Sequence, residues 1–194
     1  MSEPLPAHAT SMRPSPWIVR FSPLVVAGAR VLDVACGQGR HARWFAGRGC
    51  RVLAVDRDVA ALAAMAGVPG IETASLDLES GAWTLPEERF DAIVVTNYLH
   101  RPLFADLLAA LTGDGTLLYE TFARGNEAYG RPSNPAHLLE PGELLRIIAG
   151  RLAVVAFEEG RVDVDGRVAV VQRVAAFGAG RAWPPVLPAA VRMR

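Results

Sequence analysis

Residues 31–40, which read VLDVACGQGR, decide the fold. The apolar run at 30–34 predicts a buried strand, and the small residues after it predict a sharp turn into a helix. Gly37 and Gly39 suit this turn because a glycine has no Cβ, so the backbone can turn tightly and a ligand can come close. Two glycines alone are weak support for a ligand site, because the same turn also occurs for packing reasons. The other motifs of the chain must separate the two interpretations.

Further apolar runs rich in β-branched residues alternate with helical patterns along the chain. The runs lie at 51–55, 71–74, 90–96 and 115–120, and the helical patterns at 39–48, 58–66 and 102–111. This alternation predicts parallel strands joined by crossover helices. After a last helix, two strands at 152–158 and 167–175 predict an antiparallel hairpin. The predicted fold class is therefore α/β, with a single Rossmann-like, doubly wound, mostly parallel seven-stranded sheet that ends in an antiparallel hairpin.

The 194 residues suit one domain. We expect it to span residues 23–177. The segment 1–22 precedes the first strand and is expected to cover the cofactor or the substrate, or to pack on the sheet. The tail 178–194 is rich in proline and is predicted to be poorly ordered.

Composition narrows the class of protein. All 20 basic residues are arginine and they balance 20 acidic residues without a basic stripe, so we expect no nucleic-acid partner. Cys36 and Cys50 lie outside any metal-ligand spacing, which predicts no metal site and fits a reducing compartment. No signal peptide or apolar run long enough to span a bilayer is visible, so we expect a cytoplasmic protein without a membrane partner. The oligomeric state is not readable from the sequence.

Two acidic residues follow predicted strands where a nucleoside site needs them. Asp56 ends the second strand about 20 residues after the glycine turn, where this architecture places a carboxylate that accepts hydrogen bonds from ribose. Asp77 follows the third strand and is expected within reach of an adenine amino group. Asp56 also suits a favourable charge at the start of the next helix, and Asp77 also suits a solvated loop. Together with Asp33 and the glycines, the two acids favour a nucleoside site.

The order of these segments resembles that of the class I S-adenosylmethionine-dependent methyltransferases. Residues 31–39, 53–56, 76–78 and 90–97 are similar to the first four motifs of that family, and the closing hairpin also matches its sheet. The resemblance implies methyl transfer as the activity and S-adenosylmethionine as the cofactor. Ala35 departs from the pattern, since many members have a glycine there. We expect this small replacement to tighten the site without abolishing it.

The resemblance also implies roles for single residues. The glycine turn would pass the methionine part of the cofactor, Asp56 would hold the ribose, and Asp77 with Leu78 would bracket the adenine. Asn97 would face the sulfonium, while Asp33 would orient the turn or contact the methionine amino group through water. The complete cofactor set is Asp33, Ala35, Cys36, Gly37, Gly39, Asp56, Arg57, Asp77, Leu78 and Asn97.

Within the family, the sequence Gly39-Arg40-His41 and the helix start at 140–145 resemble the compact tellurite-resistance-type methyltransferases. Those enzymes place a histidine–arginine group late in the chain, whereas residues 160–166 contain no histidine. This difference counts against methylation of an oxyanion. The resemblance implies a small-molecule acceptor without naming it.

The acceptor side is less defined. Residues 97–102 follow the fourth strand at the ligand edge of the sheet and lack the Asn/Asp-Pro-Pro-Tyr/Phe sequence of amino-directed DNA methyltransferases. His100 is a candidate general base, since a histidine changes charge near neutral pH, and a capping or merely polar role is equally consistent. Tyr98 is the second catalytic candidate.

The loop after the fifth strand, residues 122–135, is longer than an ordinary connection. We expect it to act as a lid over the methyl donor, converging with Tyr98 and His100, and the alternative is a surface loop pinned by proline. Its acceptor-binding candidates are Tyr129, Arg131 and Asn134.

Two other functions remain open. Residues 37–42 loosely fit a dinucleotide fingerprint, which would suit a nicotinamide-dependent oxidoreductase. A non-catalytic nucleoside-binding module that activates a partner would also show few catalytic residues.

Overall fold

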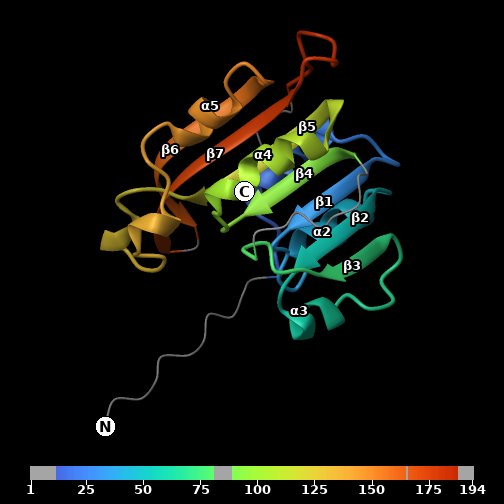
Figure 1. Cartoon of the computed structure of the whole chain (residues 1–194), viewed down its shortest axis with the longest axis horizontal. Coiled ribbons are helices and arrows are strands. Elements are labelled where there is room, and N and C mark those ends of the chain that lie inside the picture. Colours follow the sequence, from blue (N-terminus) through green and yellow to red (C-terminus); the bar gives the residue numbers. More distant parts are fainter. Residues whose placement is uncertain (1–11, 81–88, 165, 188–194) are drawn as a thin grey trace.

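The structure is a computed structural model that describes residues 12–80, 89–164 and 166–187. Its strands are β1 Arg30–Val34, β2 Arg51–Asp56, β3 Ile71–Ser75, β4 Phe90–Thr96, β5 Leu111–Phe122, β6 Leu152–Val164 and β7 Arg167–Gly178. Its helices are α1 Pro16–Phe21, α2 Arg40–Ala46, α3 Val59–Ala63, α4 Phe104–Ala110 and α5 Glu143–Ile148 (Figure 1). Short 3₁₀ turns are η1 Ser22–Leu24, η2 Arg101–Leu103, η3 Asn126–Ala128 and η4 Pro135–His137.

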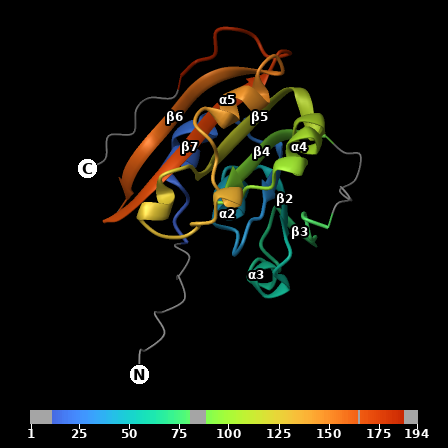
Figure 2. The ribbon, with the colours of Figure 1, turned by 60° about the vertical axis from the view of Figure 1, so that its left-hand side comes forward.

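The strands form one seven-stranded sheet in the order β3-β2-β1-β4-β5-β7-β6. The pairs from β3 to β5 are parallel, and β7 pairs antiparallel with both β5 and β6. Figure 2 shows the β6–β7 hairpin at one edge of the sheet and β3 at the other. The predicted fold class is confirmed. The strand order reverses between β1 and β4, and ligands of open α/β sheets bind at the carboxyl ends of the strands at such a point.

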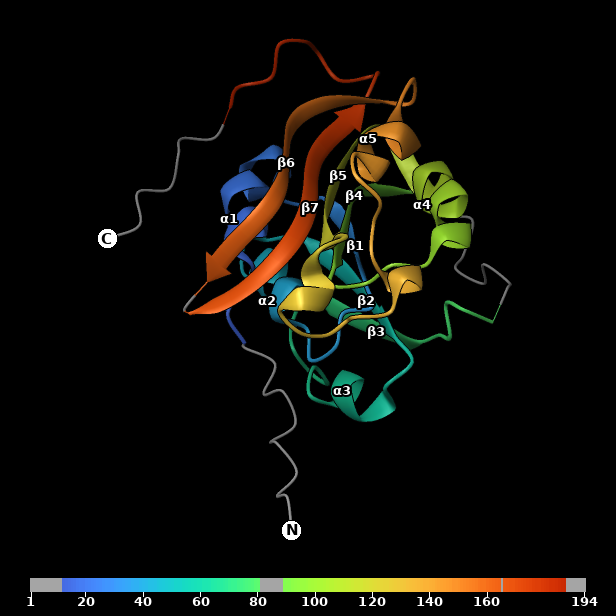
Figure 3. The same cartoon turned by 90° about the vertical axis from the view of Figure 1, so that its left-hand side faces the viewer.

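Helices cover both faces of the sheet, so its central strands are apolar on both sides. On one face Leu32 and Val34 pack in a cluster with residues of α4 and α5. On the other face Val31 packs with residues of α1, α2 and α3. Figure 3 shows α1 and α2 on one side of the sheet and α4 and α5 on the other. Successive side chains of β1 therefore pack into the two hydrophobic clusters in turn. This packing on both faces holds the carboxyl end of β1 in place.

Local sequence explains where the helices begin and end. Asp58 caps α3 by accepting hydrogen bonds from the amides of Ala60 and Ala61. The helices are shorter than the periodicity suggested, and α2 ends at Ala46 just before two glycines. The last helix, α5, begins at Glu143, after Gly142 with a φ of 65°, so Pro141 precedes the helix.

The described parts of both terminal segments pack on the domain. Trp17, Ile18 and Phe21 of α1 are buried in the core on the α2 face. At the other end, the Arg181 guanidinium donates to the carbonyl of Leu24 (2.9 Å), and the ring of Trp183 contacts that of Phe177. Trp183 is nevertheless 67% exposed, and the poorly ordered tail stays a prediction. Residues 1–11 and 188–194 lie outside the described residues.

Candidate active site

The glycine turn after β1 uses its small residues for three different reasons. Gly37 has a φ of 53° with open space around its missing Cβ, so a ligand has room to approach its backbone. Gly39 has a φ of 78°, and a Cβ there would lie 1.8 Å from the sulfur of Met65. Its second requirement is therefore close packing against Met65, two residues after α3. Ala35 also has a positive φ, 51°, which is strained for a residue with a Cβ.

Asp33 lies in β1, just before the turn, and is 1% exposed. Its Oδ2 accepts a hydrogen bond from the amide of Ala42 (2.9 Å), while its Oδ1 is buried without a partner among the described residues. Burial raises the pKa of Asp33 to about 7, against the opposing effects of the Ala42 amide and Arg40. A buried carboxylate oxygen without a donor is costly and fits a ligand that brings an N–H group, such as the ammonium of a methionine moiety.

Asp56 is tied to the turn. Its Oδ2 accepts from the amide of Gly37 (2.8 Å) and its Oδ1 from the amide of Asp58 (2.9 Å). Each carboxylate oxygen has a second lone pair, so ribose hydroxyls can still be accepted. Asp77 is exposed, follows β3, and accepts from the amide of Glu79 (3.0 Å).

Tyr98 lies near the acidic residues that follow β2 and β3. Burial raises its pKa to about 12, helped by Glu79, Asp77 and Asp56 and opposed by Arg57. Its hydroxyl is buried and has no partner within the part of the chain that the structure describes. The tyrosine therefore faces the charged groups expected to hold the nucleoside. Its neighbour Asn97 is exposed and has a φ of 56°. The backbone N–H of Asn97 donates to the carbonyl of Glu120.

The loop after β5 lies beyond the carboxyl ends of β4 and β5 (Figure 1). The buried side chain of Asn126 anchors it by donating to the carbonyl of Pro132 (3.1 Å) and accepting from the amide of Val170 (3.1 Å). Tyr129 is 47% exposed and Arg131 is also exposed.

The other acceptor candidates have local roles. Asn134 accepts from the amide of Ala136 and so starts η4. The half-buried His100 precedes η2 without a side-chain capping bond. Together with Tyr129 and Arg131, these residues follow the carboxyl ends of β4 and β5. No hydrogen bond or ion pair between described residues joins the side chains of this group to the glycine turn, so their convergence stays a prediction.

A buried polar network beside the turn was missed. His41, 1% exposed, accepts from the amide of Ser15 (3.0 Å) at Nε2, and its Nδ1 lies 3.3 Å from the hydroxyl of Thr96. Arg40 also reaches that hydroxyl, at 3.5 Å. Ser15, whose amide binds His41, also donates its hydroxyl to Glu120 (2.9 Å). Arg40 and His41 directly follow the glycine motif, which was the available signal, whereas nothing local marks Ser15.

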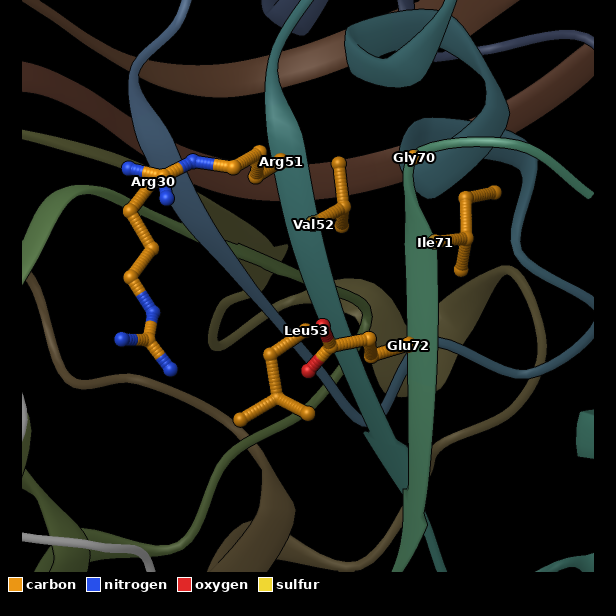
Figure 4. Close-up of a pocket in the computed structure, with 7 residues that line it drawn as sticks. All are labelled: Arg30, Arg51, Val52, Leu53, Gly70, Ile71 and Glu72. Carbon is orange, nitrogen blue, oxygen red and sulfur yellow. The ribbon is translucent and has the colours of Figure 1, made fainter.

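The cavity drawn in Figure 4 is not this site. It has a volume of about 360 Å³ and opens at the amino ends of β1, β2 and β3. Its lining is Arg30, Arg51, Val52, Leu53, Gly70, Ile71 and Glu72. The candidate site lies at the opposite, carboxyl ends of the same strands. Among the described residues there is no cluster of acidic, histidine and cysteine side chains that suits a metal ion, and no helix is long and apolar enough to cross a membrane.

Comparison with known proteins agrees with this geometry. Residues 31–115 match the family model of the methyltransferase domain. An uncharacterised protein of Schizosaccharomyces pombe, UNK4.09, is 26% identical over 206 aligned residues, which cover 79% of this chain and 60% of that protein. The chain thus spans less than two thirds of the length of this relative.

Solved structures share the fold. TehB from Haemophilus influenzae superposes with a TM-score of 0.70 at 18% identity, covering 83% of this chain and 61% of that one. A TehB-like S-adenosylmethionine-dependent methyltransferase from Corynebacterium glutamicum gives 0.61 at 23% identity, covering 84% and 86%. The N-methyltransferase NodS from Bradyrhizobium japonicum gives 0.63 at 19% identity, covering 82% and 92%.

Residues 31–115 therefore resemble the methyltransferase domain in sequence, and the sheet has the fold of the class I methyltransferases. The predicted resemblance to TehB-like enzymes is confirmed. This domain family implies S-adenosylmethionine as the methyl donor. The open backbone at Gly37, the orphaned oxygen of Asp33 and the acid Asp56 fit that cofactor.

Proposed function

We propose that this protein transfers a methyl group from S-adenosylmethionine to a small-molecule acceptor at the carboxyl edge of β1 and β4. The observation that carries the proposal is the glycine turn at the topological switch point. There Gly37 leaves open space and its amide is held by Asp56 (2.8 Å), while Asp33 presents a buried oxygen without a donor among the described residues. When bound, the cofactor supplies an electrophilic methyl group on a sulfonium.

The residues of this chain then bind and orient. Asp33 offers an acceptor for the methionine ammonium, and Asp56 offers its free lone pairs to ribose. Tyr98, neutral because burial raises its pKa to about 12, offers a hydroxyl on the nucleoside side. Asp77 and Leu78 follow β3 and would bracket the adenine, with Arg57 beside them. Asn97 would face the sulfonium from the end of β4.

On the acceptor side, His100 is the proposed general base, and the loop that carries Tyr129, Arg131 and Asn134 is the proposed lid. Transfer from a sulfonium to a soft or basic nucleophile depends mainly on alignment and exclusion of water. A strong base is therefore not essential. Cys36 and Cys50 are buried and unpaired, which supports a cytoplasmic location.

Calorimetry tests the cofactor. We expect S-adenosylmethionine and S-adenosylhomocysteine to bind with dissociation constants on the order of 1 μM, about 8 kcal/mol. Binding of a nicotinamide dinucleotide in their place would overturn the proposal in favour of an oxidoreductase.

A second experiment tests turnover. The protein is incubated with a metabolite extract and S-adenosylmethionine carrying a trideuteromethyl group, and products are identified by mass spectrometry. A small molecule that gains the labelled methyl group is the expected result, with Asp56→Ala as the control that must lose it. Tight cofactor binding without any labelled product would favour the nucleoside-binding module.

A further inference from the structure

Arg101 joins two separate segments of the chain on the acceptor side of the sheet. It is the first residue of η2, directly after His100, and its guanidinium makes four hydrogen bonds. Nη1 donates to the carbonyl of Ala136 (2.7 Å), and Nη2 donates to the carbonyl of Leu138 (2.8 Å). Ala136 lies in η4 and Leu138 directly follows it, where the loop after β5 ends. One side chain from the connection after β4 therefore holds the end of that loop by its backbone.

Glu143, the first residue of α5, provides the other two bonds. Its Oε1 accepts from Nε of Arg101 (2.7 Å) and its Oε2 from Nη2 (2.9 Å), the paired geometry in which an arginine fork matches a carboxylate. The hydrogen bond to Glu143 raises the pKa of Arg101. Burial acts to raise the pKa of Glu143, but Arg101 outweighs it and the pKa is lowered, so both groups are charged at neutral pH. We call the bonds from Arg101 to Ala136, Leu138 and Glu143 the Arg101 clamp.

The segment that carries His100 is also held from its other side. The hydroxyl of the buried Tyr119 donates to the carbonyl of Tyr98 (2.8 Å). The amide of Asn97 donates to the carbonyl of Glu120 (2.9 Å). The residues before His100 are thus tied to β5, and the residue after it is tied to the loop and to α5.

The loop after β5 is anchored at two points. Asn126 holds its first part to β7 through the amide of Val170, and Arg101 holds its end. The exposed Tyr129 and Arg131 lie between these anchors. Anchors on both sides limit how far this part of the loop can move relative to η2.

We propose that Arg101 is a positioning residue that fixes the segment of His100 against the loop of Tyr129 and Arg131, so that the acceptor site is preorganised. The role in turnover rests on the proposed function, whereas the Arg101 clamp is a property of the folded chain. Preorganisation matters because methyl transfer depends on alignment, and a displacement of about 1 Å can cost about 100-fold in rate. The role needs an arginine, since its five donors are spread over a planar fork and those of a lysine are on one nitrogen.

Hydrogen exchange followed by NMR tests the clamp without an acceptor. The probes are the amides of Leu103 in η2 and His137 in η4, which close those turns by backbone hydrogen bonds. In Arg101→Gln both amides should exchange at least about 10-fold faster, because the two segments lose the side chain that joins them. The amide of Val170, at the other anchor, should exchange as in the wild type. Its exchange rate also reports any loss of global stability.

Two further variants make the experiment specific. Arg124→Gln removes the same charge from the same loop at a side chain that is 40% exposed, against 39% for Arg101, and its ion pairs are long, at 3.8 and 3.9 Å. It should change the exchange of neither turn. Arg101→Lys keeps the charge beside Glu143 without the fork, and should exchange nearly as fast as Arg101→Gln. Faster exchange at His137 with Leu103 unchanged, or full protection in the lysine variant, would overturn the clamp.

Steady-state kinetics with the acceptor found by the labelled-methyl experiment tests the positioning role. Arg101→Gln should lower kcat/KM for the acceptor at least about 10-fold and raise its KM, while S-adenosylhomocysteine affinity stays within about 2-fold. Partial unfolding would instead lower kcat and leave KM unchanged. Arg124→Gln should keep wild-type kinetics.

The outcomes separate the two proposals. An unchanged kcat/KM in Arg101→Gln despite faster exchange would show a purely structural ion pair and overturn the positioning role. If the wild type neither binds S-adenosylhomocysteine nor methylates any acceptor, the proposed function fails, and hydrogen exchange still decides whether the Arg101 clamp joins the two segments.

Discussion

The amide of Gly37 donates to Oδ2 of Asp56 across 2.8 Å, so the turn after β1 and the acid that ends β2 form one unit. Asp56 also accepts from the amide of Asp58 through its other oxygen (2.9 Å). The carboxylate therefore shapes the turn before any ribose reaches it. Cofactor affinity and local stability are consequently linked at this residue.

Asp56→Ala should lower both properties. The loss of two accepted amide bonds is expected to reduce the free energy of unfolding by about 1–3 kcal/mol, and the loss of ribose contacts should weaken S-adenosylhomocysteine by at least about 10-fold. Urea unfolding and calorimetry measure the two effects. Asp58→Ala is the matched control: it removes the α3 cap, costs about 1 kcal/mol, and should leave affinity unchanged. A normal affinity in Asp56→Ala would make the residue purely structural.

The buried carboxyl of Asp33 predicts a pH dependence. Its pKa is raised by burial from 3.8 to about 7, so in that interval the folded chain holds a proton that the unfolded chain has released. Stability from this group is therefore complete below about pH 4, falls as the pH rises towards about 7, and is level above that. Asp33→Asn keeps an acceptor for the Ala42 amide and removes the titration.

The measurement is the difference in unfolding free energy between Asp33→Asn and wild type. It should shift in favour of the variant as the pH rises from about 4 to about 7. His41, whose pKa is lowered to about 3, gives the opposite slope below its ordinary value of 6.5, but it does so in both proteins and cancels in the difference. A difference that stays constant with pH would mean that Asp33 is already ionised.

Ala35 should gain from replacement by glycine. A residue with a Cβ at a φ of 51° carries strain of about 1–2 kcal/mol, and glycine gives back about 0.5–1 kcal/mol through its larger unfolded entropy. Thermal and urea unfolding should show Ala35→Gly equal to wild type or up to about 1 kcal/mol more stable. The same change at the exposed Ala109 of α4 should instead cost about 1 kcal/mol. Equal losses at both positions would contradict the strain.

Ser15 allows one hydrogen bond to be removed selectively. Ser15→Ala keeps the amide that donates to His41, whereas Ser15→Pro deletes it at a φ of −55° that proline adopts readily. Both variants lose the hydroxyl bonds to Trp17 and Glu120. We expect only the proline variant to disturb the Nδ1-protonated form of His41 in ¹⁵N NMR spectra and to weaken S-adenosylhomocysteine beyond Ser15→Ala. Identical spectra and affinities in the two variants would mean that the Ser15 amide does not position His41.

The lid prediction concerns acceptor turnover. Tyr129→Ala and Arg131→Ala change exposed side chains, so cofactor affinity and stability should stay near those of wild type. The rate of methyl transfer to the acceptor found with the labelled cofactor should fall by at least about 10-fold, since only acceptor positioning is lost. Steady-state kinetics measures this rate in both variants and in Asn134→Ala, the third candidate of the loop. Full activity in both variants would assign the loop a structural role only.

The central strands were predictable because they are buried on both faces. The apolar runs at 30–34 and 90–96 gave the bounds of β1 and β4 directly. The long ends of the hairpin were not predictable: β6 continues past Glu158 to Val164 through charged residues, which hydropathy assigns to a loop. Pairing with β7, rather than burial, keeps those residues extended.

The candidate site also contains residues that could be predicted from the sequence and residues that could not. Asp33 lies in β1, Gly37 follows that strand and Asp56 ends β2, so their spacing along the sequence was enough to predict them together. The Ser15, Glu120 and Arg173 contacts join residues from distant parts of the chain. They depend on the register that pairs Glu120 with Arg173 across β5 and β7, and on α1 packing over the sheet. No local pattern encodes that register.

The sheet order also bears on how the protein is made. β7 is the last strand along the chain and yet lies between β5 and β6. Until residue 178 has left the ribosome, β5 is an open edge whose residues 117–119 are apolar and end up buried. Such an edge on a nascent chain is a site for mispairing with other chains. Synthesis that pauses before β7 is complete should therefore leave the protein most dependent on chaperones at that moment.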